Sequence, residues 1–324
     1  DIAMIGALML DIAGTHLNSE DIQLLQHPQV GGVILFDRNM ESPEQVKQLT
    51  SDLQAQSNEK VPLFIGIDEE GGDVVRMAEK LTPAPSQKEI GATGDIEQAK
   101  TWAIKTAKSL KDMGINVNFA PVADVGSNDK RSYSTDANTV IDFVRAATKG
   151  YQQENIIYSL KHFPGIGKGK VDSHIDSSSI DVAKEVLMTE DILPFKTIID
   201  ESDPNDYFIL VSHLKYLALD EEYPASLSSK IMTDLLRNEL GYKGIIITDD
   251  MEMGAVANHN DFRSIGVNAV KAGADIVLVC HEYEHQQEVY LGLLDAVNNG
   301  EISQERIDES IKRIIKVKLL HLYQ

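Results

Sequence analysis

Residues 156–174 read IIYSLKHFPGIGKGKVDSH and form the most informative stretch of the chain. Residues 156–160 are mostly apolar and partly β-branched, which is typical of a buried strand. The three glycines between residues 165 and 169 disfavour a helix directly after it. Lys161 and His162 are therefore expected at the C-terminal end of a strand, where a glycine-rich loop begins.

The same stretch ends in a pair formed by a carboxylate and an imidazole. Asp172 and His174 flank a single residue, so in an extended loop their side chains point to the same side. A carboxylate in that position can orient the imidazole ring. With Lys161 and His162, four side chains able to exchange protons fall within this short segment.

Apolar runs of strand length recur along the chain, and most are continuous, which suits parallel strands buried on both faces. They cover residues 4–10, 32–36, 62–68, 117–124, 156–162, 207–213, 244–250 and 275–281. Segments with helical spacing lie between or after them, at residues 43–56, 96–113, 140–154, 182–200, 230–240, 263–272 and 303–322. This alternation predicts an α/β fold with a single-domain (β/α)8 TIM barrel over residues 1–324, and a doubly wound open sheet is the alternative.

A barrel of this kind places its active site at the C-terminal ends of the strands. Polar residues stand at the end of each predicted strand, as expected for such a site. They are Asp11, Asp37, Arg38, Asp68, Glu69, Asp124, Lys161, His162, Ser212, His213, Asp249, Asp250 and His281.

The composition limits the function further. Of 324 residues, 42% are hydrophobic and 25% are charged, and no apolar run is long enough to span a bilayer. A net charge of −21 argues against nucleic acid and anionic membranes as partners, because both would repel the chain. The single cysteine, Cys280, excludes an internal disulfide and a multi-cysteine metal site. We expect a monomer without a cofactor or a metal site that acts on a small molecule.

The chain begins at Asp1 without a methionine, which leaves room for an upstream segment. We expect a cytoplasmic protein, or a secreted or cell-surface protein if an upstream signal has been removed.

The chain resembles glycoside hydrolase family 3, specifically its single-domain bacterial β-N-acetylhexosaminidases. The resemblance rests on motifs in the family's order: GGVILFDRN (31–39), GIDEEGGDVVR (66–76), NFAPVADV (118–125), KRSYS (130–134), KHFPGIG (161–167), DSH (172–174), VSH (211–213) and GIIITDDMEMGA (244–255). It implies a retaining exo-hydrolase that removes terminal β-linked N-acetylglucosamine, in bacteria commonly from peptidoglycan fragments.

The resemblance also implies roles for individual residues. Asp249 matches the family's nucleophile, and a carboxylate fixed at a strand end suits attack on an anomeric carbon. Asp250 would face away from the centre and cap the next helix. His174 matches the general acid/base, and Asp172 would hold its tautomer.

Sugar-binding positions are implied in the same way. Asp68, Arg76, Arg131, Lys161 and His162 match the family's polar contacts to the sugar, and His213 is expected to line the pocket. Guanidinium and carboxylate groups suit this role because they form paired hydrogen bonds with vicinal hydroxyls, and the cations would help to keep Asp249 ionised.

The chain departs from the commoner family pattern at two positions. Asp73 stands where an arginine is common, and Ile166 stands where a second histidine is common. Neither change touches the predicted catalytic pair, but both bear on aglycone preference. The segment GKGK (167–170) is a candidate source of replacement cations for an anionic leaving group.

Three alternative functions remain open. A phosphorylase or a transglycosidase would use the same covalent intermediate but resolve it with phosphate or another sugar. A non-catalytic sugar-binding barrel would not need Asp249, Asp172 and His174 together. A β-glucosidase is disfavoured because such relatives usually carry an additional domain that supplies a carboxylic acid/base.

Overall fold

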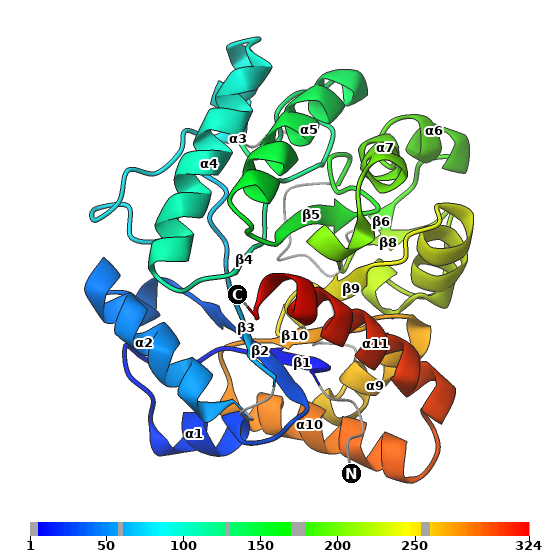
Figure 1. Ribbon diagram of the computed structural model, residues 1–324. Coiled ribbons are helices and arrows are strands. Elements are labelled where there is room, and N and C mark those ends of the chain that lie inside the picture. The colour runs from blue at the N-terminus through cyan, green and yellow to red at the C-terminus, as the bar shows by residue number, and fades with distance from the viewer. Residues whose placement is uncertain (1–5, 58–60, 127–129, 170–178, 254–259, 324) are drawn as a thin grey trace.

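The computed structural model describes residues 6–57, 61–126, 130–169, 179–253 and 260–323. Eight parallel strands form the centre, and helices surround them (Figure 1). The strands are β1 (Leu8–Leu10), β2 (Val30–Leu35), β3 (Phe64–Ile67), β4 (Val117–Asn118), β5 (Tyr158–Phe163), β7 (Tyr207–Val211), β9 (Ile245–Thr248) and β10 (Val277–Val279). Each lies within or overlaps one of the predicted strands, so all eight predictions are confirmed.

These strands follow barrel order in two hydrogen-bonded arcs. One arc runs β10-β1-β2-β3-β4, and the other runs β5-β7-β9. Isolated parallel bridges link the arcs at both seams, namely Val117 with Ile157, Val122 with Lys161, and Ile247 with Ile276. The fold is therefore the predicted (β/α)8 barrel, although its ladders do not run unbroken around the ring. The open-sheet alternative is wrong, because the last strand, β10, pairs with the first, β1.

The helices cover the outside of the strands and close one end of the barrel (Figure 1). They are α1 (Ser19–Leu25), α2 (Pro43–Gln56), α3 (Gln87–Ala92), α4 (Ile96–Asp112), α5 (Ala137–Gln153), α6 (Lys184–Thr189), α7 (Leu193–Glu201), α9 (Phe262–Ala272), α10 (Tyr283–Asn298) and α11 (Gln304–His321), with the π-helix η4 (Lys230–Glu239) and the 3₁₀ turns η1 (Asp37–Asn39), η2 (Pro204–Asp206) and η3 (Ala225–Leu227). No described helix is long and apolar enough to cross a membrane.

Local capping explains where the long helices begin. The side chain of Ser42 accepts a hydrogen bond from the N–H of Gln45, and Pro43 supplies a preset backbone angle at the first turn of α2. Asp136 caps α5 in the same way by accepting from the N–H of Thr139. Both helices therefore start at the residues that their sequences favour.

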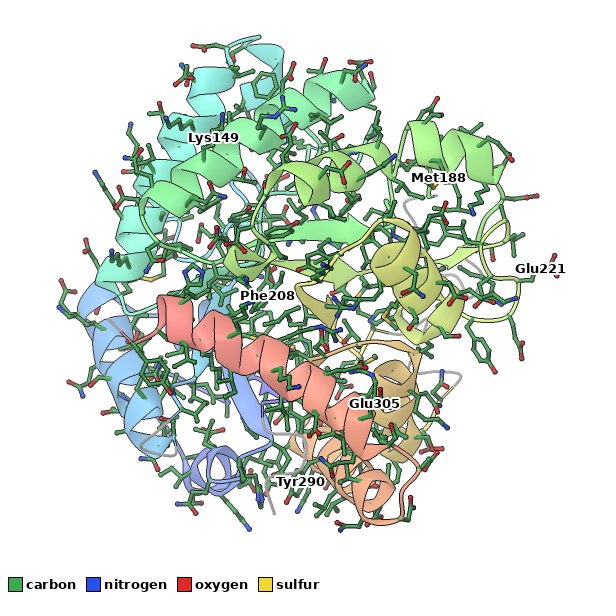
Figure 2. The ribbon with its side chains drawn as sticks, turned by 45° about the vertical axis from the view of Figure 1, so that its right-hand side comes forward. Lys149, Met188, Phe208, Glu221, Tyr290 and Glu305 are labelled. Carbon is green, nitrogen blue, oxygen red and sulfur yellow. The ribbon has the colours of Figure 1, made fainter. Side chains whose placement is uncertain are left out.

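The apolar core has two layers, as the alternation of side chains along a strand requires. The inner layer fills the barrel with residues such as Met9, Phe64 and Phe208, and Figure 2 labels Phe208 there. A Cβ atom on Gly66 would lie only 2.7 Å from the ring of Phe119, so the filled interior leaves room for glycine alone. From α11, Ile314 joins this layer and closes the N-terminal end of the barrel.

The structure differs from the sequence expectation in several places, and the helices α1, α3 and α10 were not among the expected segments. The helix expected over residues 182–200 is split into α6 and α7. Pro194 lies in the first turn of α7, where its missing N–H is tolerated, whereas it would break a continuous helix. A short parallel pair of strands, β6 (Ser179–Ile180) and β8 (Lys215–Tyr216), lies outside the ring and was not predicted.

Candidate active site

A buried lysine at the end of β5 lies at the centre of the polar cluster. The Nζ atom of Lys161 lies 2.7 Å from Oε1 of Glu70 and 3.1 Å from Oδ1 of Asp68, both in the segment after β3. Burial disfavours the charged lysine, but Glu70 and Asp68 more than offset it and raise the pKa of Lys161 above its usual range. The side chain is therefore a cation held between two carboxylates.

Glu70 is shared between two cations. Its carboxylate accepts hydrogen bonds from Nε and Nη2 of Arg131 at 3.0 and 2.6 Å, in addition to its contact with Lys161. Burial alone would raise the pKa of Glu70, but the neighbouring Lys161 and Arg131 lower this pKa to about 2. Glu70 thus fixes two of the predicted sugar-binding residues at once. It was absent from the predicted site.

The position of His162 determines its tautomer. Nη2 of Arg131 lies 3.3 Å from Nε2 of His162, and arginine can only donate, so Nε2 accepts. Nδ1 therefore carries the proton and donates to Oδ2 of Asp124 at 2.9 Å. The other oxygen of Asp124 accepts from the backbone N–H of His162 and of Ile166. His162 is consequently a neutral, fixed ring.

Arg76 closes the cluster on the side of β3. Its Nη2 lies 3.6 Å from Oδ2 of Asp68, and its Nε, which is buried, has no hydrogen-bond acceptor within the described part of the chain. The backbone N–H of Arg76 donates to both carboxylate oxygens of Glu69, at 3.1 and 3.2 Å. Burial raises the pKa of Glu69 to about 7.

Asp249 and Asp250 follow β9 and differ in their partners. The N–H of Asp250 donates to Oδ1 of Asp249 at 2.9 Å. The side chain of Asp250 accepts from the N–H groups of Cys280 and Glu252, at 3.0 and 3.1 Å. Asp250 therefore ties down the backbone after β9 and caps a turn, whereas Asp249 stays half-buried with a carboxylate that the backbone aims.

Asp249 also differs from five other carboxylates of the cluster. Asp11, Asp68, Glu70, Asp124 and Asp250 each lie within ion-pair distance of an arginine, a lysine or a histidine. Across the described residues, no such partner lies beside Asp249. The cations that were expected to keep Asp249 ionised are instead bound to Asp68 and Glu70.

His213, after β7, is buried and held at both ring nitrogens. Nδ1 lies 2.6 Å from Oγ of Ser226, and Nε2 lies 2.7 Å from the backbone oxygen of Asp250. Its place beside the cluster agrees with the predicted position at a strand end, but its partners are protein atoms.

The loop beyond β5 is described only as far as residue 169. Asp172 and His174 lie outside the described residues, so the Asp–His pair stays a prediction. The expectation that the GKGK segment offers free cations is wrong for Lys168, because its Nζ lies 2.6 Å from both Glu190 and Asp191. Asp73 is exposed, and its carboxylate lies 3.7 Å from the amine of Lys130.

A hollow of about 540 Å³ lies elsewhere on the molecule. Asn116, Ile156 and Tyr323 are among its lining residues, which places it at the N-terminal ends of β4 and β5. The polar cluster lies at the opposite ends of these strands, where barrels of this kind carry their chemistry. We therefore assign the candidate site to the cluster and not to this hollow.

Comparison with known proteins identifies the family of this chain. Residues 4–317 match the model of the glycosyl hydrolase family 3 N-terminal domain. β-Hexosaminidase A of Pseudoalteromonas piscicida is 35% identical over 94% of this chain and 56% of its own length. A β-hexosaminidase of Nitrosomonas eutropha is 33% identical over 95% of this chain and 90% of its own length.

A solved structure gives the same result. The family 3 β-N-acetylglucosaminidase of Paenibacillus sp. FPU-7 superposes with a TM-score of 0.93 at 36% identity, over 98% of this chain and 61% of that one. The chain thus spans little more than half of two of these proteins and nearly all of the third. With its barrel, its strand-end cluster and these matches, the chain belongs to glycosyl hydrolase family 3, and the curated relatives that it matches are β-hexosaminidases.

Proposed function

We propose that the chain is a retaining exo-β-N-acetylglucosaminidase that acts on terminal β-linked N-acetylglucosamine, with peptidoglycan-derived fragments as the substrate. The family membership and the β-N-acetylglucosaminidase from Paenibacillus support the sugar and the reaction class. The proposal assigns Asp249 as the nucleophile, His174 as the general acid/base and Asp172 as the residue that orients His174.

One observation carries the assignment of Asp249. It lies half-buried at the end of β9, and no lysine, arginine or histidine of the described part of the chain lies within ion-pair distance of its carboxylate. A carboxylate locked in an ion pair is a poorer nucleophile, because attack would require the pair to be broken. An aimed but unpaired carboxylate is suited to bond formation with an anomeric carbon.

The reaction would follow two displacements. In the first, an oxygen of Asp249 bonds to the anomeric carbon while the bond to the leaving oxygen breaks, and His174 gives that oxygen a proton. In the second, His174 takes a proton from water, the water oxygen bonds to the anomeric carbon, and Asp249 leaves as a carboxylate. Both steps conserve charge without a metal or a redox cofactor.

The remaining residues would hold the sugar. Two of the three N–H groups of Lys161 donate to Glu70 and Asp68, and the third is available to donate to a sugar hydroxyl. The buried Nε of Arg76 is a donor without a described protein acceptor, so a sugar oxygen could satisfy it. Asp68, Arg131 and His162 complete the proposed sugar-binding surface, and their mutual contacts fix it before substrate arrives.

A substrate panel tests this function. Aryl β-N-acetylglucosaminide, β-N-acetylgalactosaminide and β-glucoside are offered with and without phosphate, and NMR follows the anomer formed first. We expect preference for the N-acetylglucosaminide, a β-configured first product and no glycosyl phosphate. An α-configured first product would overturn the retaining mechanism, and accumulation of a sugar phosphate would make the protein a phosphorylase.

A further inference from the structure

His213 has no ring nitrogen left for a ligand. The residue is only 6% exposed, and its two ring nitrogens lie 2.6 Å from Ser226 Oγ and 2.7 Å from the backbone oxygen of Asp250. A residue that binds sugar needs a polar atom that faces the substrate. Both ring nitrogens of His213 instead bond to protein atoms, one in the turn η3 and the other in the segment after β9.

The carbonyl partner fixes the direction of one hydrogen bond, and the direction of the other then follows for a neutral ring. A carbonyl oxygen can only accept, so Nε2 of His213 must carry a proton and donate to Asp250. In the neutral ring Nδ1 is then the acceptor, and the hydroxyl of Ser226 donates to it. Ser226 lies in the turn η3 and is fully buried, and its N–H is fixed to the backbone oxygen of Ser212. The ring is thereby held in one tautomer and one orientation.

Asp250 links the fixed ring of His213 to Asp249. Its carbonyl is held by His213, its carboxylate by the N–H groups of Cys280 and Glu252, and its own N–H donates to Oδ1 of Asp249. The backbone that aims Asp249 is therefore restrained from β7 through His213 and from β10 through Cys280.

We propose that His213 is a positioning residue for Asp249 and acts through the backbone of Asp250, with Ser226 holding its Nδ1 and so its ring orientation, and that it is not a contact to the sugar. This inference rests on the proposed function, because it takes Asp249 as the nucleophile. It assigns a role to Ser226, which no sequence motif indicated, and it reassigns His213 from the pocket lining.

Three variants of the intact chain separate the roles. His213→Leu removes the donor, His213→Gln keeps an N–H donor at a similar reach, and Ser226→Ala leaves the ring but removes the hydrogen bond that holds its Nδ1. For each we would measure kcat and KM on an aryl β-N-acetylglucosaminide, the dissociation constant of free N-acetylglucosamine, and the midpoint of urea unfolding. The unfolding midpoint separates misfolding from a loss of positioning.

Positioning predicts a loss in kcat with ground-state binding preserved. We expect His213→Leu to lower kcat by about thirtyfold, since a nucleophile displaced by a fraction of an ångström loses alignment. His213→Gln should recover most of that loss, Ser226→Ala should lie between them, and all three should bind N-acetylglucosamine within about twofold of the parent chain. If His213→Leu does not fold, the other two variants still carry the test.

Several results would overturn the inference about His213. A tenfold or greater weakening of N-acetylglucosamine binding in His213→Gln or His213→Leu would make His213 a sugar contact and overturn the inference. An unchanged kcat in His213→Leu, or equal losses in the Gln and Leu variants, would also overturn it. If a fluorinated substrate labels a residue other than Asp249 in the parent chain, the proposed function itself fails, and this result is independent of the variants.

Discussion

The amine of Lys161 and the carboxylate of Glu70 form a buried ion pair, with 2.7 Å between Nζ and Oε1 and side chains that are 3% and 2% exposed. Removal of one partner from such a pair leaves an uncompensated charge inside the protein. Arg131 donates two hydrogen bonds to the same carboxylate, so Glu70 also fixes the orientation of that guanidinium group.

Glu70→Gln should therefore affect both stability and binding. We expect the free energy of unfolding to fall by about 3 kcal/mol, and KM for an aryl β-N-acetylglucosaminide to rise at least about tenfold because Lys161 and Arg131 lose their common anchor. Urea unfolding and steady-state kinetics check this. The control is Glu79→Gln, an exposed position that should change neither quantity. Normal stability and KM in Glu70→Gln would show that Asp68 alone holds Lys161.

Glu69 gives the folded protein a dependence on pH. Burial raises its pKa from 4.5 to about 7, so between pH 4.5 and 7 the folded state binds more protons than the unfolded state. Stability from this group is therefore present below pH 4.5 and is lost as the pH rises through 7. We expect Glu69→Gln to be more stable than the parent chain at pH 8, by at most about 3 kcal/mol, and this advantage to shrink towards pH 5.

Urea unfolding of both proteins at pH 5, 6, 7 and 8 measures that difference. The amide oxygen introduced by Glu69→Gln can still accept from the N–H of Arg76, so the loop should keep its shape. A stability difference that does not vary with pH would mean that Glu69 is not the titrating group.

Lys318 should make the stability of the folded protein depend on pH in the opposite sense above pH 7. Its amine donates to the backbone oxygen of Gly31 at 2.9 Å and lies 4.7 Å from the centre of the Phe64 ring, and burial lowers its pKa to about 7. Between pH 7 and 10.5 the unfolded state binds more protons than the folded state, so the contribution of this group to stability rises with pH. Lys318→Met should therefore exceed the parent chain in stability at pH 7, and the gap should narrow towards pH 10.

The matched control for this variant is Lys316→Met, an exposed position on the same helix, which should show no such trend. Thermal unfolding of the three proteins at pH 7, 8.5 and 10 tests the prediction. If Lys318→Met is less stable than the parent chain at every pH, the contacts to Gly31 and Phe64 outweigh the cost of burying the charge.

His174 can be tested through the leaving group. As the proposed acid, His174 should matter greatly for alkyl or sugar leaving groups and much less, in the first step, for acidic phenols that depart without a proton. General acid/base help is typically worth about a hundredfold to ten-thousandfold. His174→Ala should also show a burst with an activated aryl substrate, followed by slow turnover that azide accelerates. Equal losses for all leaving groups, without a burst, would point to another acid/base.

Much of the fold follows from the sequence because burial on both faces leaves continuous apolar runs, which mark strands such as β5, β7 and β9. Capping residues such as Ser42 and a first-turn proline also mark where α2 begins. The division at Pro194 was missed because residues 182–200 keep helical spacing on both sides of the break.

The site was less predictable because adjacent carboxylates cannot be ranked by sequence. In the run from Asp68 to Glu70, the first and third carboxylates meet at Lys161, whereas Glu69 accepts from the backbone N–H of Arg76. The turn that follows contains Gly71, whose φ is +108°. The central place of Glu70 therefore emerged only with the structure. The link from Ser226 through His213 to Asp250 depends on how η3 packs against the strand ends, which no local motif records.

Covalent trapping identifies the nucleophile directly. The protein is incubated with a slow fluorinated N-acetylglucosaminyl substrate and digested, and mass spectrometry locates the sugar on one residue. We predict one sugar per chain, attached to Asp249, no labelling of Asp249→Ala, and normal labelling of the exposed control Asp73→Asn. A sugar on Asp250 or any other side chain, or full turnover in Asp249→Ala, would contradict the account.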